Sequence, residues 1–499
     1  MKRVFRRFVL VLPALILQVL WYITLIRVFN AYAIYLNGLL ALFSIIFVFF
    51  ILSRRDEGTY KQLWITVLLV FPLLGTILYV SFGNKRTARP IRKRLNKSFS
   101  KTPPLEKTDY IEKIEEEDLR IARIMNSVMA PSGMPIQKIE TCEYYPLGDD
   151  MYPHMLTALR GAKKFIYCEY FIVNEGILWN SFVDIMAEKA KEGVEVLVMY
   201  DDIGSISTYS YSNVKKLRAK GIKCQAFNPM YFLHGTANYR DHRKILVVDN
   251  EVAFSGGINL SDEYINKKVR FGHWKDIGFK VTGDAVKNFT YMFCTFWNAF
   301  SKTPITENTY EKESVGGEEG YVLSYFDTPV ENYATSNTLY IELLSQAKNY
   351  VWFYTPYLML GDMLLDAFCR AAERGVDVKI IMPGIPDKKR VYKMSKSYYK
   401  KLLDAGVEIY EYSKGFVHSK ACIFDDTLCT IGTVNLDYRS LYLHFENNSL
   451  FYKSKILFDL KDDFMKTLKT CRKVELSDIK RNVLHGMADA VRRFIAPLF

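Results

Sequence analysis

Two stretches of this chain carry the same five residue types at the same offsets. "HRKILVVDNEVAFSGGIN" begins at His242, "HSKACIFDDTLCTIGTVN" begins at His418, and both follow H-x-K-x4-D-x6-G-x2-N. An imidazole can attack phosphorus or move a proton near neutral pH, whereas an ammonium and a carboxamide suit phosphate oxygens. The repeated motif therefore predicts chemistry on a phosphate ester, with one set of groups in each half of the chain.

We expect the two sets to face each other across one phosphorus atom. One imidazole bonds to phosphorus while the other protonates the departing oxygen and then activates an incoming alcohol or water. The lysines and asparagines neutralise charge on the equatorial oxygens, so no metal or other cofactor is expected. The aspartates should brace the strand and turn of each motif. The predicted catalytic set is His242, Lys244, Asp249, His418, Lys420 and Asp425, with Asn259 and Asn435 binding phosphate.

Short β-rich runs separated by helical periods surround both motifs. Because matching runs recur in the same order in both halves, the sequence indicates an internal duplication. The alternation predicts an α/β fold with two sheets and a shared site between the halves. The expected strands are 164–173, 194–200, 222–227 and 244–249, then 350–358, 376–382, 407–412 and 420–425, with helices at 178–192 and 361–374.

The N-terminal part of the chain contains three uncharged apolar runs, at 8–26, 28–53 and 62–84. A helix needs about 20 apolar residues to cross a bilayer, so each run is long enough for a transmembrane span. The alternative for the first run is a cleaved signal peptide, but cleavage near Ala33 leaves two runs of membrane length. The sequence predicts a multi-pass anchor in the cell membrane.

The basic segment Lys85–Lys97, "KRTARPIRKRLNK", follows the third run without an acidic residue. Positive-inside counting places this flank, and with it the catalytic portion, in the cytoplasm. The basic N-terminus prefers the same side, and three spans cannot satisfy both flanks, so the number of spans stays open. The flank and the net charge of +13 favour contact with anionic lipid.

These features divide the chain into six parts. A chain of 499 residues is too long for one ordinary core. The expected parts are an anchor at 1–84, a basic polar linker at 85–118, a first α/β unit at 119–305, a junction at 306–320, a second unit at 321–480 and an amphipathic helix at 481–499. For that last helix, packing against the protein is expected rather than lying on the membrane.

The duplicated motif resembles the hallmark of the phospholipase D superfamily over residues 140–470. The chain is more narrowly similar to bacterial cardiolipin synthases in "LSRRDEGTYKQLW", "HGTANYRDHRK", "GGINLSDEY", "HWKDIG" and the terminal "APLF". The resemblance implies a metal-independent transfer that joins two phosphatidylglycerols and releases glycerol. It suggests His242 as nucleophile and His418 as general acid, and the reverse order stays open.

The same resemblance implies a carboxylate that orients each imidazole. Asp276 follows His242 and Glu446 follows His418, so the spacing pairs each carboxylate with the histidine of its own half. Gly257 and Thr433 stand where many relatives carry serine, which leaves a hydroxyl contribution in doubt. Tyr239 and Arg240, just before the first motif, are weaker candidates for substrate binding.

Two other classes of protein compete with this interpretation. The net charge also suits a nuclease, but the basic excess lies beside the third apolar run rather than along an aromatic groove, so no nucleic-acid partner is expected. A membrane scaffold with relict motifs is disfavoured because all ten motif positions are present. Another lipid donor, or water as acceptor, stays open. The remaining histidines at 154, 234, 273, 444 and 485 are expected to be structural, with His234 and His273 possible at the mouth of the site.

Overall fold

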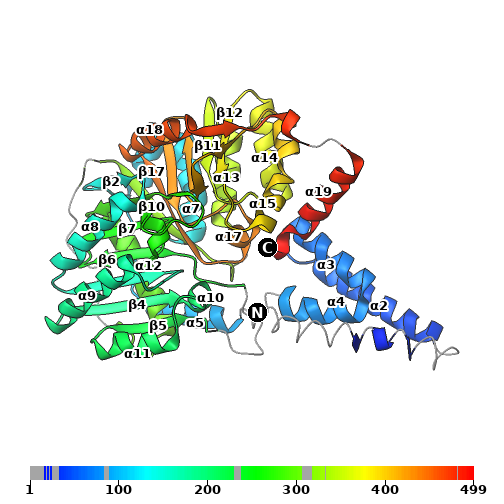
Figure 1. Ribbon diagram of the computed structural model, residues 1–499, viewed down its shortest axis with the longest axis horizontal. Coiled ribbons are helices and arrows are strands. Elements are labelled where there is room, and N and C mark those ends of the chain that lie inside the picture. The colour runs from blue at the N-terminus through cyan, green and yellow to red at the C-terminus, as the bar shows by residue number, and fades with distance from the viewer. Residues whose placement is uncertain are drawn as a thin grey trace. The chain divides into compact units, whose positions relative to one another are not determined.

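The computed structural model describes residues 16–17, 19–21, 23–24, 33–83, 89–229, 238–305, 317, 319–331, 333–479 and 482–499. These residues form two compact units. The first ends at Arg89, and the second contains the described residues from Pro90 to Pro497. We refer to them as the N-terminal unit and the α/β unit (Figure 1).

The N-terminal unit consists of helices α2 (Ala33–Leu52), α3 (Gly58–Val70) and α4 (Pro72–Leu78), followed by a π-helical turn at Tyr79–Gly83. The side chain of Glu57 caps α3 by accepting a hydrogen bond from the Tyr60 N–H at 3.1 Å. The rings of Trp64 and Tyr79 pack with their centroids 5.4 Å apart, and the Tyr60 hydroxyl donates to the Gly83 carbonyl at 3.0 Å. Aromatic contacts therefore hold α3 against the turn.

The predicted spans map onto this unit unequally. Run 28–53 contains α2, whereas run 62–84 is divided between α3 and α4. Pro72 explains the division, because proline has no N–H to donate and its ring displaces the preceding turn of a helix. Most of run 8–26 lies outside the described residues. Within the part of the chain that the structure describes, no helix combines the length and the apolar character needed to cross a membrane.

A seven-stranded sheet forms the first half of the α/β unit. Strands β3, β4 and β5 run parallel, while β6, β7, β9 and β2 continue the sheet in antiparallel pairs. The order is β2 (Cys142–Tyr145), β9 (Gly278–Thr282), β7 (Val252–Gly256), β6 (Lys244–Val248), β3 (Phe165–Tyr170), β4 (Glu195–Asp201) and β5 (Lys223–Phe227). Every residue of β6 is buried, as expected for a continuous apolar strand covered on both faces.

A nine-stranded sheet forms the second half and repeats this order. Strands β17, β16, β15, β11, β12 and β13 take the places of β9, β7, β6, β3, β4 and β5. The full order is β1 (Gln137–Lys138), β10 (Tyr321–Asp327), β17 (Glu446–Tyr452), β16 (Leu428–Gly432), β15 (Ala421–Phe424), β11 (Tyr350–Tyr354), β12 (Asp377–Pro383), β13 (Glu408–Tyr412) and β18 (Cys471–Lys473). The eight predicted strands are confirmed within a few residues at each end.

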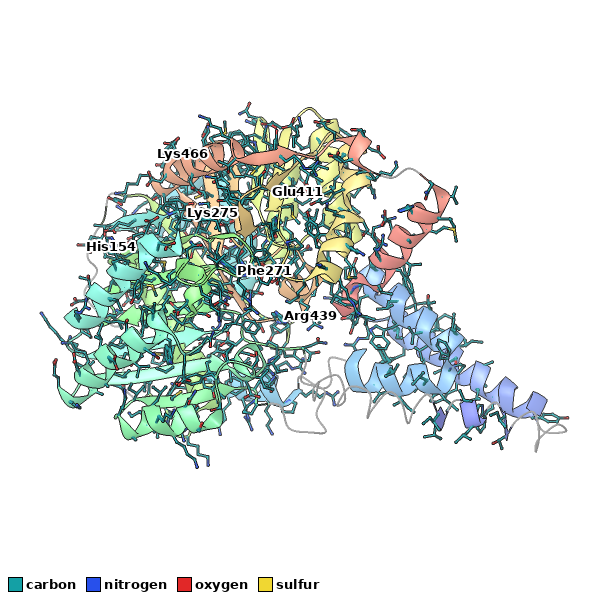
Figure 2. The ribbon with its side chains drawn as sticks, viewed as in Figure 1. His154, Phe271, Lys275, Glu411, Arg439 and Lys466 are labelled. Atoms are coloured by element: carbon teal, nitrogen blue, oxygen red, sulfur yellow. The ribbon has the colours of Figure 1, made fainter. Side chains whose placement is uncertain are left out.

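The two sheets pack together, and a short parallel ribbon joins their halves. The rings of Phe279 in β9 and Phe451 in β17 lie 5.2 Å apart. Strand β8 (His273–Lys275) of the first half pairs with β14 (Gly415–Val417) of the second. Lys275, labelled in Figure 2, reinforces this junction because its Nζ donates to both carboxylate oxygens of Asp463 at 2.8 and 2.7 Å. Both halves therefore belong to one compact unit.

Helices cover the sheets and complete the core. The predicted helices 178–192 and 361–374 correspond to α9 (Ile177–Lys191) and α14 (Asp362–Glu373). The others in the described part of this unit are α5 (Arg89–Phe99), α6 (Tyr110–Glu117), α7 (Leu119–Ser132), α8 (Gly148–Gly161), α10 (Asp202–Ser205), α11 (Tyr211–Ala219), α12 (Ala285–Phe300), α13 (Thr335–Gln346), α15 (Lys389–Lys396), α16 (Tyr399–Asp404), α17 (Tyr438–Tyr442), α18 (Ile456–Leu468) and α19 (Val483–Ile495).

Two connecting segments differ in what can be said of them. The expected linker 85–118 contains α5 and α6, and from Pro90 onward it belongs to the compact α/β unit. The Ser98 hydroxyl in α5 donates to the Thr295 carbonyl in α12 at 2.7 Å, so this segment packs against the first half. The expected junction 306–320 lies almost entirely outside the described residues.

Candidate active site

The two histidines of the repeated motif occupy equivalent buried positions, just before β6 and β15. In each motif the lysine side chain turns back toward its histidine. Lys244 Nζ donates to the His242 carbonyl at 2.5 Å, and Lys420 Nζ donates to the His418 carbonyl. Each strand therefore presents an imidazole and an ammonium to the same small volume.

The segment that precedes each motif histidine pairs with the other half of the chain. The His242 N–H donates to the Phe445 carbonyl at 2.8 Å, so the backbone before His242 runs beside the backbone before Glu446. The β8–β14 ribbon repeats this arrangement, and there the His418 N–H donates to the Lys275 carbonyl at 2.7 Å. Each motif histidine is thus placed beside the carboxylate that follows the other motif.

The carboxylate partners are consequently exchanged relative to the expectation from spacing. His242 Nδ1 lies 2.8 Å from Glu446 Oε2 and 3.0 Å from Oε1, whereas His418 Nδ1 lies 2.6 Å from Asp276 Oδ2. The pairing within each half is therefore wrong. In both pairs Nδ1 faces the carboxylate, which leaves Nε2 as the nitrogen that can meet a substrate.

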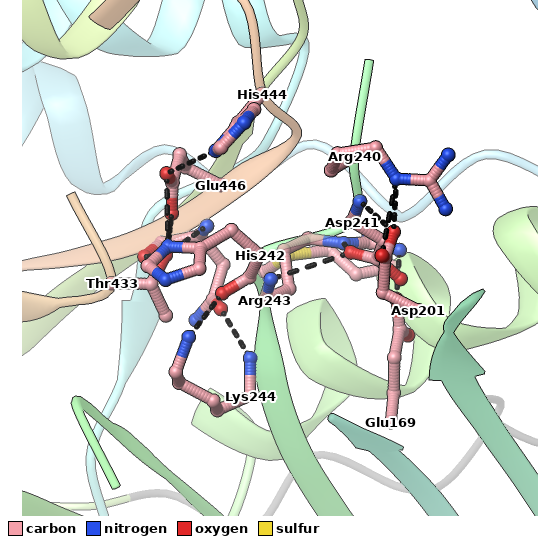
Figure 3. Close-up of polar contacts among 12 residues, drawn as sticks. Glu169, Asp201, Arg240, Asp241, His242, Arg243, Lys244, Thr433, His444 and Glu446 are labelled. Atoms are coloured by element: carbon pink, nitrogen blue, oxygen red, sulfur yellow. Dashed lines mark hydrogen bonds and ion pairs between the residues drawn. The ribbon is translucent and has the colours of Figure 1, made fainter. Parts of the chain in front are cut away.

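Glu446 lies in a dense set of polar contacts (Figure 3). The Thr433 hydroxyl donates to Oε2 at 2.5 Å, and the Ser440 hydroxyl donates to Oε1 at 2.6 Å. His444 Nδ1 is 3.9 Å from Oε1, and its ring centroid lies 5.9 Å from that of His242. From the sequence, a hydroxyl contribution of Thr433 is in doubt, His444 is expected to be structural, and Ser440 is not predicted. All three lie within 13 residues of Glu446 in the chain, but only the fold turns them toward it.

The surroundings of Asp276 are different. Asp276 Oδ1 accepts a hydrogen bond from its neighbour's amide, the Ile277 N–H, at 2.9 Å. A Cβ atom on Gly257 would lie only 2.1 Å from Asp276 Oδ1. Glycine at this position therefore lets the backbone approach the carboxylate, and it supplies no hydroxyl equivalent to that of Thr433.

The basic groups of the motifs form one electrostatic cluster that spans both halves. Burial, followed by the charge of Lys244 and Lys420, holds the pKa of His242 well below its usual value. Burial and the same lysines lower the pKa of His418 to about 4, although Asp276 opposes this shift. Burial lowers the pKa of Lys244 to about 8 and that of Lys420 to about 7. An anion bound among these groups would offset the repulsion between the neighbouring cations and would therefore raise these pKa values again.

The two orienting carboxylates carry protons differently. Burial raises the pKa of Glu446 to about 8, against the lowering effects of Lys244 and its hydroxyl partners. Burial also acts to raise the pKa of Asp276, but His418, Lys420 and the hydrogen bonds outweigh it, so that pKa is lowered. An ionised Asp276 stabilises an imidazolium on His418 more strongly than Glu446 does on His242.

The two motif asparagines already have protein partners. Asn259 Oδ1 accepts from the Ile172 N–H at 3.1 Å, and its Nδ2 donates to the Tyr264 hydroxyl at 2.8 Å. The Asn435 side chain hydrogen-bonds Asp437, while its buried Oδ1 has no hydrogen-bond partner among the described residues. Each amide nitrogen carries two hydrogens, so each keeps one donor for a phosphate oxygen.

The motif aspartates hold the strands that neighbour the motif. Asp249 accepts from the N–H groups of Lys163, Lys164 and Phe165 at 2.7, 2.8 and 2.7 Å. Asp425 accepts from those of Lys348, Asn349 and Tyr350 at 2.8, 2.8 and 2.9 Å. Both aspartates have a positive φ, 57° and 46°, as in a tight turn. These contacts support a bracing role at the starts of β3 and β11 rather than contact with substrate.

The two weaker substrate-binding candidates are buried within the protein. Arg240 is 1% exposed, and its guanidinium is engaged with Asp201 (at 2.9 Å to Oδ2) and with the carbonyls of Asn228 and Phe227. Tyr239 is also buried, and its N–H donates to the Leu443 carbonyl at 2.7 Å. The guanidinium of Arg240 is bonded to groups of the first half, which does not support a contact with substrate, while the backbone of Tyr239 and Arg240 pairs with the second half.

The other histidines are dispersed. His273 Nδ1 lies 3.0 Å from the Tyr412 hydroxyl in the β8–β14 region, and His154 pairs with Glu143 at 3.6 Å. His485 belongs to the first turn of α19, and His234 lies outside the described residues. Of these, His273 is the one that the structure places on an element leading into the site.

Among the described residues, one group has the composition of a metal site. His242, His444 and Glu446 each offer one ligand atom, and these atoms lie within 4.8 Å of one another. Metal binding there would use the nitrogen that faces Glu446 at hydrogen-bond distance. His242 and Glu446 are already placed to share a proton, and no side chain has to move for that.

Comparisons with known proteins agree with this geometry. A family model described as "Cardiolipin synthase, PLD-like domain" matches residues 155–270 and 340–468, one segment in each half. A second, described as "Phospholipase D-nuclease N-terminal", matches residues 39–84. The two matches cover residues 39–84 of the N-terminal unit and both copies of the motif.

Individual relatives cover nearly the whole chain. An uncharacterized protein of Streptococcus mutans is 42% identical over 87% of this chain and 95% of its own length. A cardiolipin synthase of Alkalihalophilus pseudofirmus is 34% identical over 91% of this chain and 92% of its own.

A solved structure supports the fold. The phosphatidylserine synthase of Haemophilus influenzae superposes with a TM-score of 0.58, at 13% identity, over 76% of this chain and 100% of that one. At that identity the likeness concerns the duplicated α/β fold alone. The matches in sequence show that this chain belongs to the cardiolipin synthase family of phospholipase D-like proteins.

Proposed function

We propose that this protein is a cardiolipin synthase that transfers a phosphatidyl group from one phosphatidylglycerol to another and releases glycerol. The observation that carries the proposal is the pair of buried imidazoles, each bonded through Nδ1 to a carboxylate of the other half, beside two buried ammonium groups. Such a cluster suits a phosphodiester, because the anion compensates the buried positive charge. The kinship with named cardiolipin synthases supports the lipid substrate.

In the first half-reaction His242 Nε2 attacks phosphorus, and the bond between phosphorus and the glycerol oxygen breaks. His418 gives its Nε2 proton to that oxygen, so glycerol leaves as a neutral alcohol. Lys244 and Lys420 neutralise the charge that grows on the phosphoryl oxygens. The phosphatidyl group is then held on His242 as a phosphohistidine.

In the second half-reaction a glycerol hydroxyl of another phosphatidylglycerol attacks the phosphohistidine. His418, now neutral, takes the hydroxyl proton, the new P–O bond forms, and the P–N bond breaks. The electron pair returns to His242, and both imidazoles regain their starting protonation. One phosphodiester bond is exchanged for another, so no nucleotide is consumed.

Electrostatics favours this order of roles. Burial and the lysines lower the pKa of both imidazoles, to about 4 for His418, but at His418 the charge of Asp276 opposes the shift. Asp276, whose pKa is lowered, remains an anion beside His418. His418 is therefore the easier imidazole to protonate once the substrate anion is bound, which suits the proton donor. His242 stays neutral, which suits the nucleophile.

We place the enzyme at the cell membrane, with a multi-pass N-terminal anchor and the α/β unit in the cytoplasm. Several large apolar side chains of α2 are exposed, among them Leu39, Leu42, Ile46 and Phe49. Burial in lipid would remove this surface from water. The basic α5, which contains five Lys or Arg and no acid, favours the side of the membrane that carries anionic lipid.

One assay separates the candidate reactions. Detergent-purified full-length protein is incubated with labelled phosphatidylglycerol in the presence of EDTA, and lipid and water-soluble products are followed. Cardiolipin with an equal amount of glycerol is expected. Phosphatidic acid alone would identify a hydrolase, and lipid turnover that requires another donor would identify a different phosphatidyltransferase. Cutting of single-stranded DNA without lipid turnover would overturn the proposal in favour of a nuclease.

A further inference from the structure

The C-terminal helix α19 exposes its apolar side. Val483, Leu484, Met487 and Val491 are 79%, 77%, 62% and 58% exposed. At 3.6 residues per turn these positions share one face of the helix. None of the helix residues is fully buried. The expectation that this amphipathic helix packs its apolar face against the protein is therefore wrong.

The opposite side of α19 holds the helix to the α/β unit. Arg493 Nη1 donates to the Ser397 carbonyl at 2.5 Å. Around the helix, at about 100° per residue, Arg493 lies about 160° from Val491 and about 80° from Val483. Ala496 and Pro497, which follow the helix, are buried. The helix is thus anchored by a polar residue and by its C-terminal end, and its apolar face is turned away from that anchor.

The neighbouring helix adds positive charge to this surface. Ser397 directly follows α15, and α15 contacts α19. Helix α15, "KRVYKMSK", contains four Lys or Arg and no acid, and Lys389, Arg390 and Lys393 are exposed. An apolar helix face beside a group of exposed cations is typical of helices that lie in the interface of an anionic bilayer.

We propose that α19 lies in the headgroup region of an anionic phospholipid bilayer, with Val483, Leu484, Met487 and Val491 inserted among the lipids and the cations of α15 on the headgroups. Anionic lipid is the occupant that the charges favour. A second copy of this surface would bring two cationic α15 helices together, and like charges repel. The inference concerns membrane contact by the α/β unit itself and holds for any phosphatidyl donor.

The test places an environment-sensitive nitrobenzoxadiazole label on full-length protein in lipid vesicles. One variant carries the label at Val491→Cys on the apolar face. The matched control carries it at Gly486→Cys, which lies two turns from Arg493 on the anchoring side, where a Cβ meets no atom within 4 Å. The unsubstituted chain, with its native cysteines, measures background labelling. Vesicles contain either phosphatidylcholine alone or phosphatidylcholine with phosphatidylglycerol.

The label at position 491 is expected to emit at shorter wavelength and to be quenched by lipids with nitroxide groups on their acyl chains. The label at position 486 should be quenched much less. Quenching at 491 should be stronger in vesicles that contain phosphatidylglycerol than in vesicles of phosphatidylcholine alone. Lys393→Glu should reduce this difference in quenching while the transfer activity in detergent is unchanged. Equal quenching at 491 and 486 would overturn the inference. A disulfide between two Val491→Cys chains without lipid quenching would assign the face to a second copy instead.

Discussion

The exchange of carboxylates between the halves can be tested with two isosteric substitutions. Asp276 contacts His418 and Glu446 contacts His242. Asp276→Asn should therefore behave like His418→Ala, and Glu446→Gln should behave like His242→Ala. Pairing within each half would give the opposite grouping. The comparison depends only on which histidine variant each carboxylate variant resembles.

The expected size of the effect follows from the contacts of Asp276. A hydrogen bond to a charged group contributes about 1.5–3 kcal/mol, so loss of the carboxylate charge should slow proton transfer about 10- to 150-fold. The tautomer adds to this loss. In Asp276→Asn the Ile277 N–H keeps the amide oxygen as its acceptor at Oδ1, so the amide NH2 faces His418 Nδ1 and leaves the proton on Nε2. A comparable change in a protease triad costs about 10⁴-fold, and we expect Asp276→Asn to fall between these limits.

The assay uses a phosphatidyl ester of p-nitrophenol beside natural phosphatidylglycerol. The nitrophenolate leaves without help from an acid, so formation of the phosphohistidine no longer needs His418. Asp276→Asn and His418→Ala should release a first-turnover burst of nitrophenolate but make little cardiolipin. Glu446→Gln and His242→Ala should show no burst. The exchange would be refuted if Asp276→Asn lost the burst as His242→Ala does. Glu446→Gln would then keep the burst as His418→Ala does.

Two further predictions concern stability and pH. Asp249→Ala should lower the melting temperature in detergent more than Asp425→Ala does, because Asp249 accepts from the buried Phe165 N–H whereas the hydrogen bonds of Asp425 are more exposed. The free energy of unfolding should differ between the two variants by about 1 kcal/mol. Equal losses of stability would contradict the bracing role. Burial and the charge of Lys244 lower the pKa of Lys420 to about 7, and this pKa should rise toward its ordinary value when a phosphodiester analogue binds. Binding at pH 8 should therefore take up protons and weaken as pH rises above about 7, which calorimetry in buffers of different ionisation enthalpy measures. Binding without proton uptake at pH 8 would show that Lys420 does not face the anion.

Much of the fold follows from local sequence. The eight predicted strands are found because each is a short run rich in apolar, β-branched or aromatic residues that can be recognised without its partner strands. Strands β7, β9, β16 and β17 were not predicted. They contain glycine, serine, asparagine or alternating polar residues, as in "VAFSG" and "ENNSLFY". These strands are buried by the packing of two sheets, which a local pattern does not report.

Residues with a charge were harder to assign than residues with an apolar pattern. Arg240 precedes a motif histidine and has the chemistry of a headgroup ligand, yet Asp201 and two carbonyls use its donors. The sequence marked Thr433 only as a doubtful hydroxyl, without its partner Glu446, and gave no sign of Ser440. The hydrogen-bond partner of a polar side chain depends on which backbone lies opposite it in the fold. Helix α19 shows that the sequence likewise does not tell what covers the apolar face of a helix.

The sequence by itself determined the candidate reacting groups, because the types and the spacing of the motif residues are properties of the chain and occur twice. It also indicated that each motif would continue into a strand. Only the tertiary structure decided which carboxylate serves which histidine. Spacing along the chain measures proximity within one half, whereas the hydrogen bonds of the site form between backbone segments that meet when the halves pack. The site is assembled from both copies for this physical reason.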